Sequence, residues 1–408
     1  MQCGLLGRKL GHSYSPQIHA RLGDYDYRLF EKEPEELEDF LKNGDFTGLN
    51  VTIPYKKDVI PFLDKLSPRA KALGAVNTIV RRDGKLIGHN TDYFGFETML
   101  LSSGVSVRGK KALVCGSGGA SNTACAVLRE QGADVIVLSR SGENNYQNLD
   151  RHTDAALIVN ATPVGMYPNV EASPIEDLTV FPKLEGVLDL VYNPARSSIL
   201  LKAEALGIPA VNGLRMLVAQ AKESAEWFTG TTIDDGCIEE IYHTLRRQME
   251  NIILIGMPGC GKTTVGTLLA QALSRPLKDA DTELEKAADR KITDIIPADG
   301  EAAFRVLESE TLLDLGKQSG LVIATGGGCV TVPSNYEKLH RNGTIVWLKR
   351  DLDLLPTNGR PLSQAGHLRE MYEKRAPLYE RFADFAVENS GDPQETVREI
   401  IRILEEKT

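Results

Sequence analysis

Short apolar runs alternate with stretches of helical periodicity along almost the whole chain. The clearest example begins with the apolar strand 112–115, continues through the helical pattern of 122–131 and ends in the strand 134–138. A strand, a helix and a second strand form a βαβ unit, which makes the two strands parallel with a right-handed crossover. The chain is therefore predicted to be an α/β protein. The same alternation predicts strands at 25–30, 48–52, 156–159, 186–190 and 252–255, and helices at 33–41, 215–228, 235–249 and 265–273.

The length of the chain indicates more than one domain. A chain of 408 residues exceeds the size at which a single hydrophobic core usually stops growing. Around residues 247–250 there is no run of Gly, Pro or Ser, so the helix at 235–249 leads almost directly into the strand at 252–255. We therefore expect a short junction at that point and not a flexible tether.

Composition and charge narrow the class of protein. Hydrophobic residues make up 42% and charged residues 25% of the chain, which is ordinary for a globular protein in water. The net charge of -9 argues against nucleic acid as a partner, and no apolar run approaches the roughly 18 residues of a membrane span. The six cysteines form no C-x-x-C pair, which argues against a zinc site or a disulfide framework. We therefore expect a cytoplasmic protein.

A glycine-rich loop, GSGGAS, follows the strand at 112–115 and occupies residues 116–121. Glycine in this context lets the backbone approach a pyrophosphate, whose charge the following helix N-terminus stabilises. The match is incomplete because Ser121 stands where a GxGxxG motif has its third glycine, and a simple tight turn is the alternative. After the next strand, Arg140 lies between Ser139 and Ser141, where a site for NAD has an acid. An arginine there suits the 2′-phosphate of NADP.

Six phrases in the first part of the chain follow one another in a characteristic order. They are GRKLGHSYSPQIH (7–19), GLNVTIPYK (48–56), GAVNT (74–78), GHNTDYFG (88–95), NATPVGM (160–166) and GLRMLVAQ (213–220). In this order and spacing they resemble shikimate dehydrogenase over about residues 1–245. That family reduces the ring ketone of 3-dehydroshikimate with NADPH. The resemblance implies a substrate-binding α/β domain over 1–93 with 214–248, and a Rossmann NADP-binding domain over 94–213.

The same resemblance implies roles for individual residues. Lys56 and Asp92 would be the catalytic pair, because an ammonium group can stabilise the alkoxide charge that a hydride creates on a ketone, and Asp92 would orient it. The sequence does not decide which group passes the proton, and a surface ion pair is the alternative. The implied substrate-binding residues are Ser13, Ser15, Thr52, Asn77, Tyr192 and Gln220. The implied cofactor-binding residues are Gly116, Ser117, Gly118, Gly119, Ala120, Ser139, Arg140, Ser141, Leu190 and Gly213. The family often has Asn-Arg-Thr at 139–141, so the strength of the preference for NADPH over NADH stays open.

A second phosphate-binding loop, GMPGCGKTT, occupies residues 256–264. It lies between the apolar run 252–255 and the helical stretch 265–273, which is the strand–loop–helix context that this motif requires. Lys262 would bridge the β and γ oxygens of a nucleotide, and the Thr263 hydroxyl would hold Mg²⁺. The loop therefore predicts a nucleoside triphosphate such as ATP as a co-substrate. Its other expected contacts to the nucleotide are Gly259, Cys260, Gly261 and Thr264.

Further phrases narrow the class of acceptor. They are DAD (279–281), FR (304–305), IATGGG (323–328), RPL (360–362) and RAPLY (375–379). Together with the loop they resemble shikimate kinase over residues 250–408. The resemblance implies a P-loop kinase domain with a parallel sheet, in which Asp279 would act on the Mg²⁺ side and Asp281 would accept the proton of the attacking 3-hydroxyl.

The remaining kinase residues would bind the acceptor or the transferred group. Arg305 and Arg375 would grip the carboxylate of shikimate, and Gly327 would let the backbone approach the ring. Arg360 would arrive from a lid to stabilise the transferred phosphoryl group. The alternatives are ion pairs of Arg305 with Glu301 or Glu308 and of Arg375 with Glu373 or Glu380, and a plain turn for the three glycines.

The lid departs from the usual family pattern. Many members have an arginine in line with Leu355, whereas residues 354–359 here carry no charge. Stacking of such an arginine on adenine is therefore not available, which leaves the recognition of adenine open.

The two resemblances share one metabolite, so we predict a bifunctional enzyme of the shikimate pathway, which leads to chorismate and the aromatic amino acids. The first part would make shikimate from 3-dehydroshikimate with NADPH, and the second would make shikimate 3-phosphate with ATP and Mg²⁺. One alternative is a quinate/shikimate dehydrogenase with another preference among polyols. Another is a regulatory protein that keeps the folds as ligand sensors, against which the presence of Lys56, Asp92, Lys262 and Asp281 argues. The expected partners are small molecules, and the oligomeric state stays open.

Overall fold

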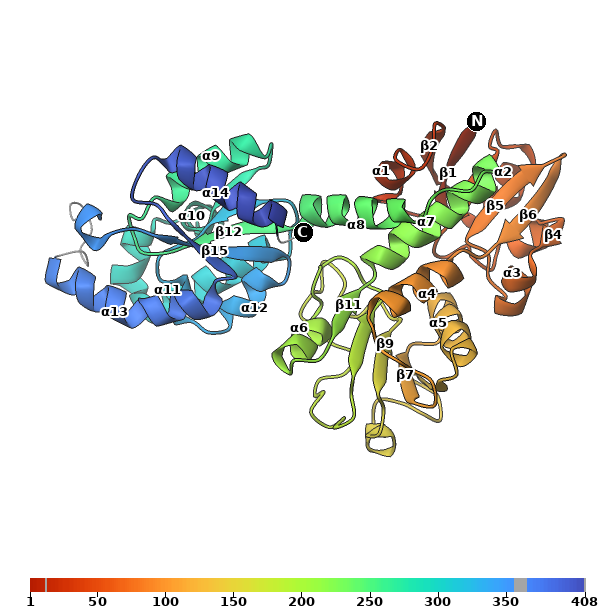
Figure 1. Ribbon diagram of the computed structural model, residues 1–408, viewed down its shortest axis with the longest axis horizontal. Coiled ribbons are helices and arrows are strands. Elements are labelled where there is room, and N and C mark those ends of the chain that lie inside the picture. The colour runs from red at the N-terminus through yellow and green to blue at the C-terminus, as the bar shows by residue number, and fades with distance from the viewer. Residues whose placement is uncertain (12, 356–364, 407–408) are drawn as a thin grey trace. The chain divides into compact units, whose positions relative to one another are not determined.

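The computed structural model describes residues 1–11, 13–355 and 365–406. The packing of the chain divides it into two compact units, of which the first comprises Met1–Asn193 and Ser197–Thr244. The second begins at Leu245 and includes the short segment Pro194–Arg196. Each unit has its own sheet or sheets and its own hydrophobic clusters (Figure 1).

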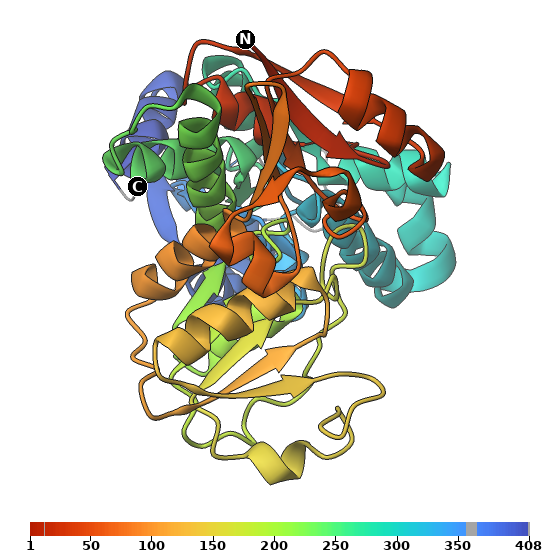
Figure 2. The same ribbon diagram turned by 90° about the vertical axis from the view of Figure 1, so that its right-hand side faces the viewer.

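The first unit opens with a mixed six-stranded sheet in the order β2-β1-β3-β5-β6-β4. Its central strand pairs are β1 with β3, which are parallel, and β3 with β5, which are antiparallel. The strands are β1 (Gln2–Gly7), β2 (Asp26–Glu31), β3 (Gly48–Val51), β4 (Lys65–Leu66), β5 (Thr78–Arg82) and β6 (Lys85–His89). In Figure 2 these red and orange strands form a sheet separate from the yellow and green strands that follow them in the chain.

The second sheet of this unit has five strands, all parallel, in the order β11-β10-β9-β7-β8. Alternate residues of β7 enter two different apolar clusters: Ala112 and Val114 pack with α5, and Leu113 and Cys115 pack with α6. Helices therefore cover both faces, as a doubly wound α/β sheet requires (Figure 1). The strands are β7 (Lys111–Cys115), β8 (Asp134–Leu138), β9 (Leu157–Asn160), β10 (Gly186–Asp189) and β11 (Ala210–Asn212).

The helices of the first unit join and cover these sheets. The longest contact between helices is made by α4 and α7, which pack side by side. The helices are α1 (Ser15–His19), α2 (Leu37–Asn43), α3 (Pro68–Leu73), α4 (Asp92–Ser102), α5 (Gly119–Glu130), α6 (Ser198–Ala205), α7 (Leu214–Thr229) and α8 (Gly236–Met249), the last of which ends in the second unit.

The second unit contains one parallel five-stranded sheet in the order β13-β14-β12-β15-β16. The strand β12 is central, so the loop after it has the ends of β14 and β13 on one side and those of β15 and β16 on the other. The strands are β12 (Asn251–Ile255), β13 (Leu277–Asp279), β14 (Val322–Ala324), β15 (Gly343–Lys349) and β16 (Phe385–Glu388). The helices are α9 (Lys262–Ala272), α10 (Ala280–Ala288), α11 (Ile292–Gly316), α12 (Asn335–His340), α13 (Ala365–Phe382) and α14 (Pro393–Glu406).

Every strand predicted from the sequence is present within one residue of its expected ends, but three helices differ. The helices α5 and α9 begin three residues earlier than expected, at Gly119 and Lys262. Glycine has a low helix propensity, yet the first turn of a helix needs no intrahelical N–H bond, so the last residues of each glycine loop already belong to the helix. The helix expected at 33–41 is a 3-10 turn, Pro34–Glu36, followed by α2.

The last turn of α8 belongs to the second unit, whose boundary lies between Thr244 and Leu245. The amide of Gly320 donates to the carbonyl of Met249 at 2.8 Å, and the guanidinium of Arg275 donates to the carbonyl of Glu250 at 2.6 Å. The strand β12 begins at Asn251, two residues after α8 ends, so the junction is short. The division of the first unit into 1–93 with 214–248 and 94–213 stays a prediction.

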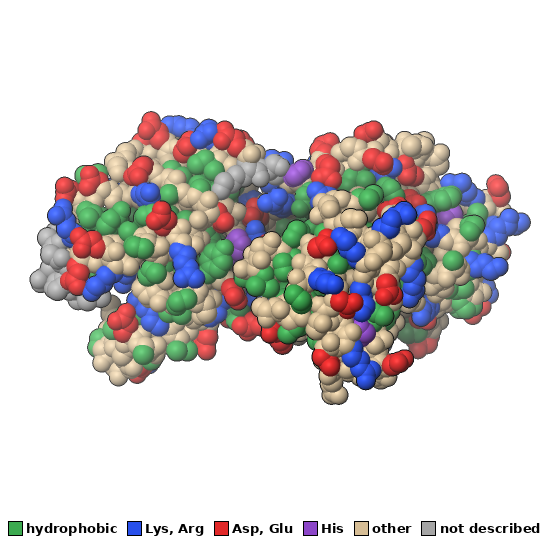
Figure 3. All heavy atoms as spheres, turned by 60° about the horizontal axis from the view of Figure 1, so that its bottom comes forward, with side chains coloured by type: hydrophobic (Ala, Val, Ile, Leu, Met, Phe, Trp, Pro, Cys, Tyr) green, Lys and Arg blue, Asp and Glu red, His purple; other side chains and the backbone are tan. Residues whose placement is uncertain are grey.

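Charged side chains of both signs are interspersed over the face that Figure 3 shows. Many form exposed ion pairs such as Lys42–Glu38 and Lys374–Glu370. Pairs of this kind contribute only about 0–1 kcal/mol each, so the buried apolar clusters supply most of the stability. Within the described residues, no helix is both long and apolar enough to cross a membrane.

Asn251 fastens the start of β12 inside the second unit, and its loss is expected to destabilise that unit. The side chain is fully buried; its amide donates to the carbonyl of Gln318 at 2.7 Å and its oxygen accepts from the amide of Leu321 at 2.8 Å. Asn251→Ala removes the partner of the Leu321 amide and one of two partners of the Gln318 carbonyl, which also accepts from Asn342 at 3.2 Å; a buried donor left unpaired costs about 1–3 kcal/mol. The urea concentration at which half of the phosphotransferase activity is lost measures this change in stability. An unchanged midpoint and slope would contradict it.

Candidate functional sites in the two units

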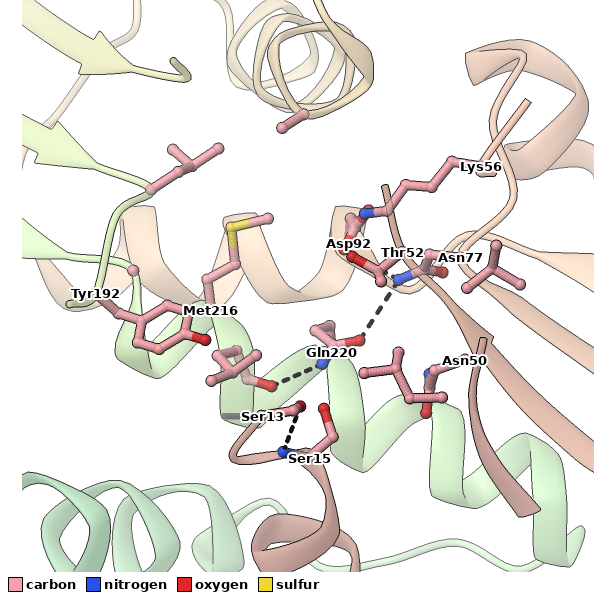
Figure 4. A pocket seen from close by; sticks show the side chains of 16 residues that line it. Ser13, Ser15, Asn50, Thr52, Lys56, Asn77, Asp92, Tyr192, Met216 and Gln220 are labelled. Atoms are coloured by element: carbon pink, nitrogen blue, oxygen red, sulfur yellow. Dashed lines mark hydrogen bonds and ion pairs between the residues drawn. The ribbon is translucent and has the colours of Figure 1, made fainter. Parts of the chain in front are cut away.

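A cavity of about 300 Å³ opens in the first unit between its two sheets. The polar residues that line it come from the loop after β1 and the start of α1, from β3 and the loop after it, from the residue before β5, from the start of α4, from the loop after β10 and from α7 (Figure 4). All eight residues expected to bind or convert the substrate line it: Ser13, Ser15, Thr52, Lys56, Asn77, Asp92, Tyr192 and Gln220. Three of the residues expected to bind the cofactor, Ala120, Leu190 and Gly213, also line it.

Lys56 and Asp92 form an ion pair at one side of this cavity. The Lys56 Nζ lies 2.6 Å from Asp92 Oδ2, and the two side chains are 23% and 10% exposed. Asp92 is the first residue of α4, where the partial positive charge of the helix N-terminus favours a carboxylate. The amide nitrogen of Asn77 donates to Asp92 Oδ1 at 3.0 Å. One oxygen of the Asp92 carboxylate therefore holds the Lys56 ammonium group, and the Asn77 amide fixes the other oxygen of the same carboxylate.

The opposite side of the cavity carries hydroxyl and amide groups. Gln220 Nε2 donates to the carbonyl of Leu217 at 2.8 Å, which turns its oxygen toward the Asn77 amide at 3.5 Å (Figure 4). The Ser13 hydroxyl accepts from the amide of Ser15 at 3.2 Å. Tyr192 packs edge-on against Tyr14, with ring centroids 6.2 Å apart. The cavity thus offers hydroxyl, amide and ammonium groups to a small polar ligand.

Sequence reasoning missed Asn50, which also lines the cavity. Its oxygen accepts from the Tyr27 hydroxyl at 2.8 Å, and its amide nitrogen donates to the Ser224 hydroxyl at 2.8 Å. The phrase GLNVTIPYK contains Asn50, and its alternation with Thr52 along an extended segment is the signal that could have found it. Met216 and Leu217 of α7 supply apolar lining that no polar motif marks.

The glycine loop after β7 has the form that a dinucleotide phosphate requires. Gly116 has φ +105°, and a side chain there would also lie 2.9 Å from the Thr162 methyl group. Side chains at Gly118 and Gly119, by contrast, would meet nothing within 4 Å, so packing within the protein does not explain those two glycines. The helix α5 begins at Gly119 with neither a side-chain cap nor an acid in its first turn. Open space at these glycines and a free helix N-terminus are the features by which such a loop can bind an anion.

Ser121 explains the missing third glycine of the motif. Its buried hydroxyl donates to the carbonyl of Gly116 at 2.7 Å, which closes the loop from within. Arg140 follows β8 and is exposed. The amide of Ser139 beside it is bonded to the carbonyl of Asn144 at 3.1 Å, so the turn around Arg140 is held in place.

In the second unit, the loop after β12 wraps around the ammonium group of Lys262. Its nitrogen donates to the carbonyls of Gly256 at 2.9 Å and Met257 at 3.1 Å. Gly259 and Gly261 have φ of +83° and +97°, which only glycine adopts without strain. Cys260 is fully buried, and Lys262, Thr263 and Thr264 lie in the first turn of α9. The loop residues expected to bind the nucleotide are therefore adjacent around one helix N-terminus.

Thr263 and Asp279 are next to each other, as their expected role toward a cation requires. The Thr263 hydroxyl donates to Asp279 Oδ2 at 2.9 Å, and Asp279 Oδ1 caps α10 by accepting from the amide of Thr282 at 3.3 Å. Within the described residues no three His, Cys, Asp or Glu side chains converge on one point. A hydroxyl and one carboxylate suit Mg²⁺, which keeps several waters and takes further oxygens from phosphates.

The acceptor side of the loop holds a cluster of charged groups around the three glycines. Side chains at Gly326, Gly327 and Gly328 would meet, respectively, Asp281 and Glu308, the ring of Pro258, and the guanidinium of Arg305. Close approach therefore accounts for the three glycines, and it is strictest at Gly327, whose neighbour is a proline ring and not the flexible end of a side chain. Burial and the nearby Asp279 raise the pKa of Asp281, which makes it a better proton acceptor.

Arg305 forms the ion pairs that the sequence offered as alternatives. It lies 2.7 Å from Glu308 and 3.0 Å from Glu301. Glu308 is buried, and burial raises the pKa of its carboxyl although Arg305 opposes the shift. Sequence reasoning gave Glu308 no role in the site, although its spacing of three residues from Arg305 on α11 is the signal that places it on the same helix face.

Arg375 contacts the same glycine turn from α13. Its guanidinium donates to the carbonyl of Gly327 at 3.2 Å, and the Tyr379 hydroxyl donates to the same carbonyl. The two arginines expected to grip a carboxylate therefore lie near successive residues of one turn. Arg360, expected in the lid, lies outside the described residues.

The other side of the loop, at the ends of β15 and β16, carries Arg350 and Asn389. Asn389 is buried; its amide donates to the carbonyl of Cys260 at 2.7 Å and its oxygen accepts from the Thr396 hydroxyl at 2.9 Å. A side chain at Gly261 would lie 3.8 Å from the guanidinium of Arg350. The sequence phrases did not point to either residue, because neither belongs to the loop motif.

These two sites define a Rossmann-type dehydrogenase joined to a P-loop phosphotransferase. Residues 5–79 match the family model described as the shikimate dehydrogenase substrate binding domain, and residues 258–405 match the one described as shikimate kinase. An NADP(+) shikimate dehydrogenase of Clostridium perfringens is 38% identical over 265 residues, which cover 60% of this chain and 97% of that protein.

Solved structures agree with these relatives. A shikimate dehydrogenase from Peptoclostridium difficile is 38% identical, with a TM-score of 0.55, and the match covers 60% of this chain and 97% of that one. A chorismate mutase/shikimate 5-dehydrogenase fusion protein from Clostridium acetobutylicum is 37% identical, with a TM-score of 0.57, and covers 60% of this chain and 96% of that one.

The chain therefore belongs to the shikimate dehydrogenase family through its first part and carries a shikimate kinase domain in the remainder. It is a bifunctional shikimate-pathway enzyme, an NADP-dependent oxidoreductase fused to a phosphotransferase. The family assignments expected from the sequence phrases are confirmed, and those families are families of enzymes and not of ligand sensors.

Gly328 is expected to control the position of Arg305. A side chain there would lie 2.3 Å from the Arg305 guanidinium, which is the flexible end of a long side chain and can move aside without disturbing the backbone. Gly328→Ala should therefore leave the fold intact and raise the KM of the phosphotransferase for its acceptor about tenfold or more, since a charge-assisted hydrogen bond contributes about 1.5–3 kcal/mol. Steady-state kinetics at saturating nucleotide measures the effect. An unchanged KM would show that Arg305 does not contact the acceptor.

Proposed function

We propose that the first unit reduces 3-dehydroshikimate to shikimate with NADPH and that the second unit transfers a phosphoryl group from ATP, with Mg²⁺, to the 3-hydroxyl of shikimate. The observation that carries the proposal is the Lys56–Asp92 pair in a cavity lined by hydroxyl and amide groups. Such a pair would help to form an alcohol, and the second unit would use that alcohol as its phosphoryl acceptor. The order of the two reactions follows from this shared alcohol.

In the dehydrogenase site the chain's own groups bind the substrate and handle the proton. The hydroxyls of Ser13 and Ser15 suit the carboxylate, and the side chains of Asn77 and Gln220 suit the ring hydroxyls, because all four line one small cavity (Figure 4). The Lys56 ammonium stabilises the developing alkoxide and gives it a proton, while Asp92 holds Lys56 in place.

The same unit has the residues to hold NADP. The pyrophosphate would lie on the loop at Gly118 and Gly119, and Arg140 would meet the 2′-phosphate. When bound, the reduced nicotinamide supplies the hydride. Leu190 and Gly213 line the same cavity as Lys56, and we assign to them the walls that the nicotinamide ring would contact.

In the kinase site, positioning and charge carry the reaction. Asp281 accepts the proton of the attacking hydroxyl, and its raised pKa suits that role. Arg305 and Arg375 bind the carboxylate of shikimate, and the Gly327 turn lets the ring lie close to the backbone. Lys262 would bind phosphate oxygens, Thr263 and Asp279 would hold Mg²⁺, and Arg360 would stabilise the transferred group. The nucleoside part of ATP would lie on the opposite side of the loop, near Arg350 and Asn389.

An assay on the intact chain tests the pair of substrates. With 3-dehydroshikimate, NADPH and ATP we expect NADPH oxidation, ADP release and shikimate 3-phosphate. When shikimate is the starting substrate, we expect ADP release if ATP is added, and NADP⁺ reduction if NADP⁺ is added in place of ATP. Quinate is the comparison substrate at equal enzyme concentration. Much faster oxidation of quinate than of shikimate would remove shikimate from the first reaction, and absence of both activities would refute the proposal.

Lys56→Ala should abolish the dehydrogenase and spare the kinase. Loss of a general acid that also stabilises alkoxide charge should lower kcat about 10²–10⁴-fold. The kinase turnover of the same sample is the control, because the two sites lie in different units. An equal fall of both activities in a folded variant would show that the units do not work independently.

Asp281→Asn should stop phosphoryl transfer and leave the nucleotide bound. The amide cannot accept the proton, so kcat of the kinase should fall about 10²–10⁴-fold, while calorimetry gives an unchanged Kd for ATP. The dehydrogenase activity of this variant should be unchanged, and it serves as the control here in the way that the kinase activity does for Lys56→Ala. Near-normal phosphoryl transfer would remove Asp281 from the role of base.

A further inference from the structure

A cluster of buried hydroxyl and amide groups lies beneath the dehydrogenase cavity. Thr78, Thr91 and Ser224 have no exposed surface, and Asn50 and Asn77 are 5% and 2% exposed. The two asparagines line the cavity, whereas the three hydroxyl residues do not. The cluster joins elements that are far apart in the sequence: Asn50 is on β3, Thr78 on β5, Thr91 immediately before α4, and Ser224 on α7.

Four of these residues close a ring of hydrogen bonds. Asn77 Nδ2 donates to Thr91 Oγ1 at 3.0 Å, and Thr91 Oγ1 lies 2.9 Å from Ser224 Oγ. Ser224 Oγ lies 2.8 Å from Thr78 Oγ1, which donates to Asn77 Oδ1 at 3.2 Å. A hydroxyl donates one hydrogen bond and accepts up to two, so a ring in which each group donates to the next satisfies every member.

Ser224 is the member on which the cluster depends. It also accepts from Asn50 Nδ2 at 2.8 Å, which fills its second acceptor position. The carbonyl of Gln220, 2.9 Å from Ser224 Oγ, is the alternative acceptor for its proton. In either arrangement the removal of this one oxygen takes a partner from Asn50 and from both threonines, and buried polar groups without partners reorient or leave their positions.

The ring reaches the reacting groups through the Asn77 amide. One amide hydrogen of Asn77 enters the ring at Thr91, and the other is directed to Asp92 Oδ1 at 3.0 Å. The other oxygen of Asp92 holds the Lys56 ammonium at 2.6 Å (Figure 4). A change in the rotation of the Asn77 amide therefore alters the hydrogen bonding of Asp92 and so the position of Lys56.

We infer that Ser224 is a positioning residue of the dehydrogenase: its buried hydroxyl closes the ring that, together with the Thr91 backbone amide at 2.7 Å from Asn77 Oδ1, fixes the Asn77 amide, and through it the carboxylate that orients Lys56. This inference rests on the proposed roles of Lys56 and Asp92. Ser224 touches no substrate and acts only through Asn77 and Asn50.

The test uses the full-length chain with Ser224→Ala, Thr91→Val and the double variant. We expect each single change to lower kcat for NADPH-dependent reduction about tenfold or more, since misplacement of a reacting group by about 1 Å can cost 10²-fold. Because both changes open the same ring, the double variant should stay within about threefold of the worse single variant. If the two changes caused unrelated structural defects, the fold-losses in kcat of the single variants would instead multiply in the double variant.

The matched control is Thr229→Val on the same helix. The Thr229 hydroxyl donates to the carbonyl four residues earlier, Ala225, at 2.9 Å, and Ser224 Oγ lies at the same distance from the carbonyl of Gln220, but Thr229 contacts no member of the ring. This variant should keep kcat within about twofold of the unaltered chain. Kinase turnover and the thermal melting of each sample report the amount of folded protein. Should Ser224→Ala fail to fold, Ser224→Cys keeps the volume with a weaker donor and should still lower kcat.

Two results would overturn the inference: full dehydrogenase activity in the folded Ser224 variants, or effects of Ser224→Ala and Thr91→Val that multiply. A lack of 3-dehydroshikimate reduction by the unaltered chain is a separate result, which refutes the proposed function itself. Activity in the unaltered chain with a tenfold, non-additive loss in the variants supports both.

Discussion

The constraint on which both sites depend is that a parallel sheet brings the carboxyl ends of its strands to one edge. In the first unit the glycine loop after β7, the turn with Arg140 after β8 and Leu190 after β10 all follow strands of one parallel sheet. In the second unit the phosphate-binding loop follows β12, Asp279 ends β13, the Gly326–Gly328 turn comes after β14 and Arg350 follows β15. Residues that are distant in the sequence thus become neighbours without any local signal for their proximity.

Each site keeps its charged groups in position with opposite charges of its own. Lys56 is paired with Asp92, and Arg305 is paired with the buried Glu308. Removing one member of such a pair leaves the other uncompensated in a partly buried place, which costs more than the pair itself contributes. The positions of the reacting groups are therefore set before any ligand arrives, and a rigid arrangement of that kind is what catalysis by orientation and charge requires.

Much of the site was predictable because its residues lie in short phrases with fixed spacing. Lys56 with Thr52, Lys262 with Thr263, and Asp279 with Asp281 are local combinations in loops next to strand ends, where polar residues have few structural reasons to occur. Asn50 and Ser224 escaped because their partners are remote. Glu308 is close to Arg305 in the sequence, but its burial beside the Gly326 turn depends on tertiary packing. Ser224 meets Thr78 across 146 positions of the chain, and nothing in the pattern of α7 distinguishes it from an ordinary small residue on the buried face of a helix.

The sequence by itself determined the α/β class, the strands, the two phosphate-binding loops and the two families, because hydrophobic periodicity and glycine requirements are local properties of the chain. Only the tertiary structure decided that α5 and α9 begin within their glycine loops and that the last turn of α8 packs with the second unit. It also decided which buried hydroxyls connect Asn50, Asn77 and Asp92. The physical reason is that a hydrogen bond or ion pair between distant residues depends on the packing of whole elements, which no short window of sequence contains.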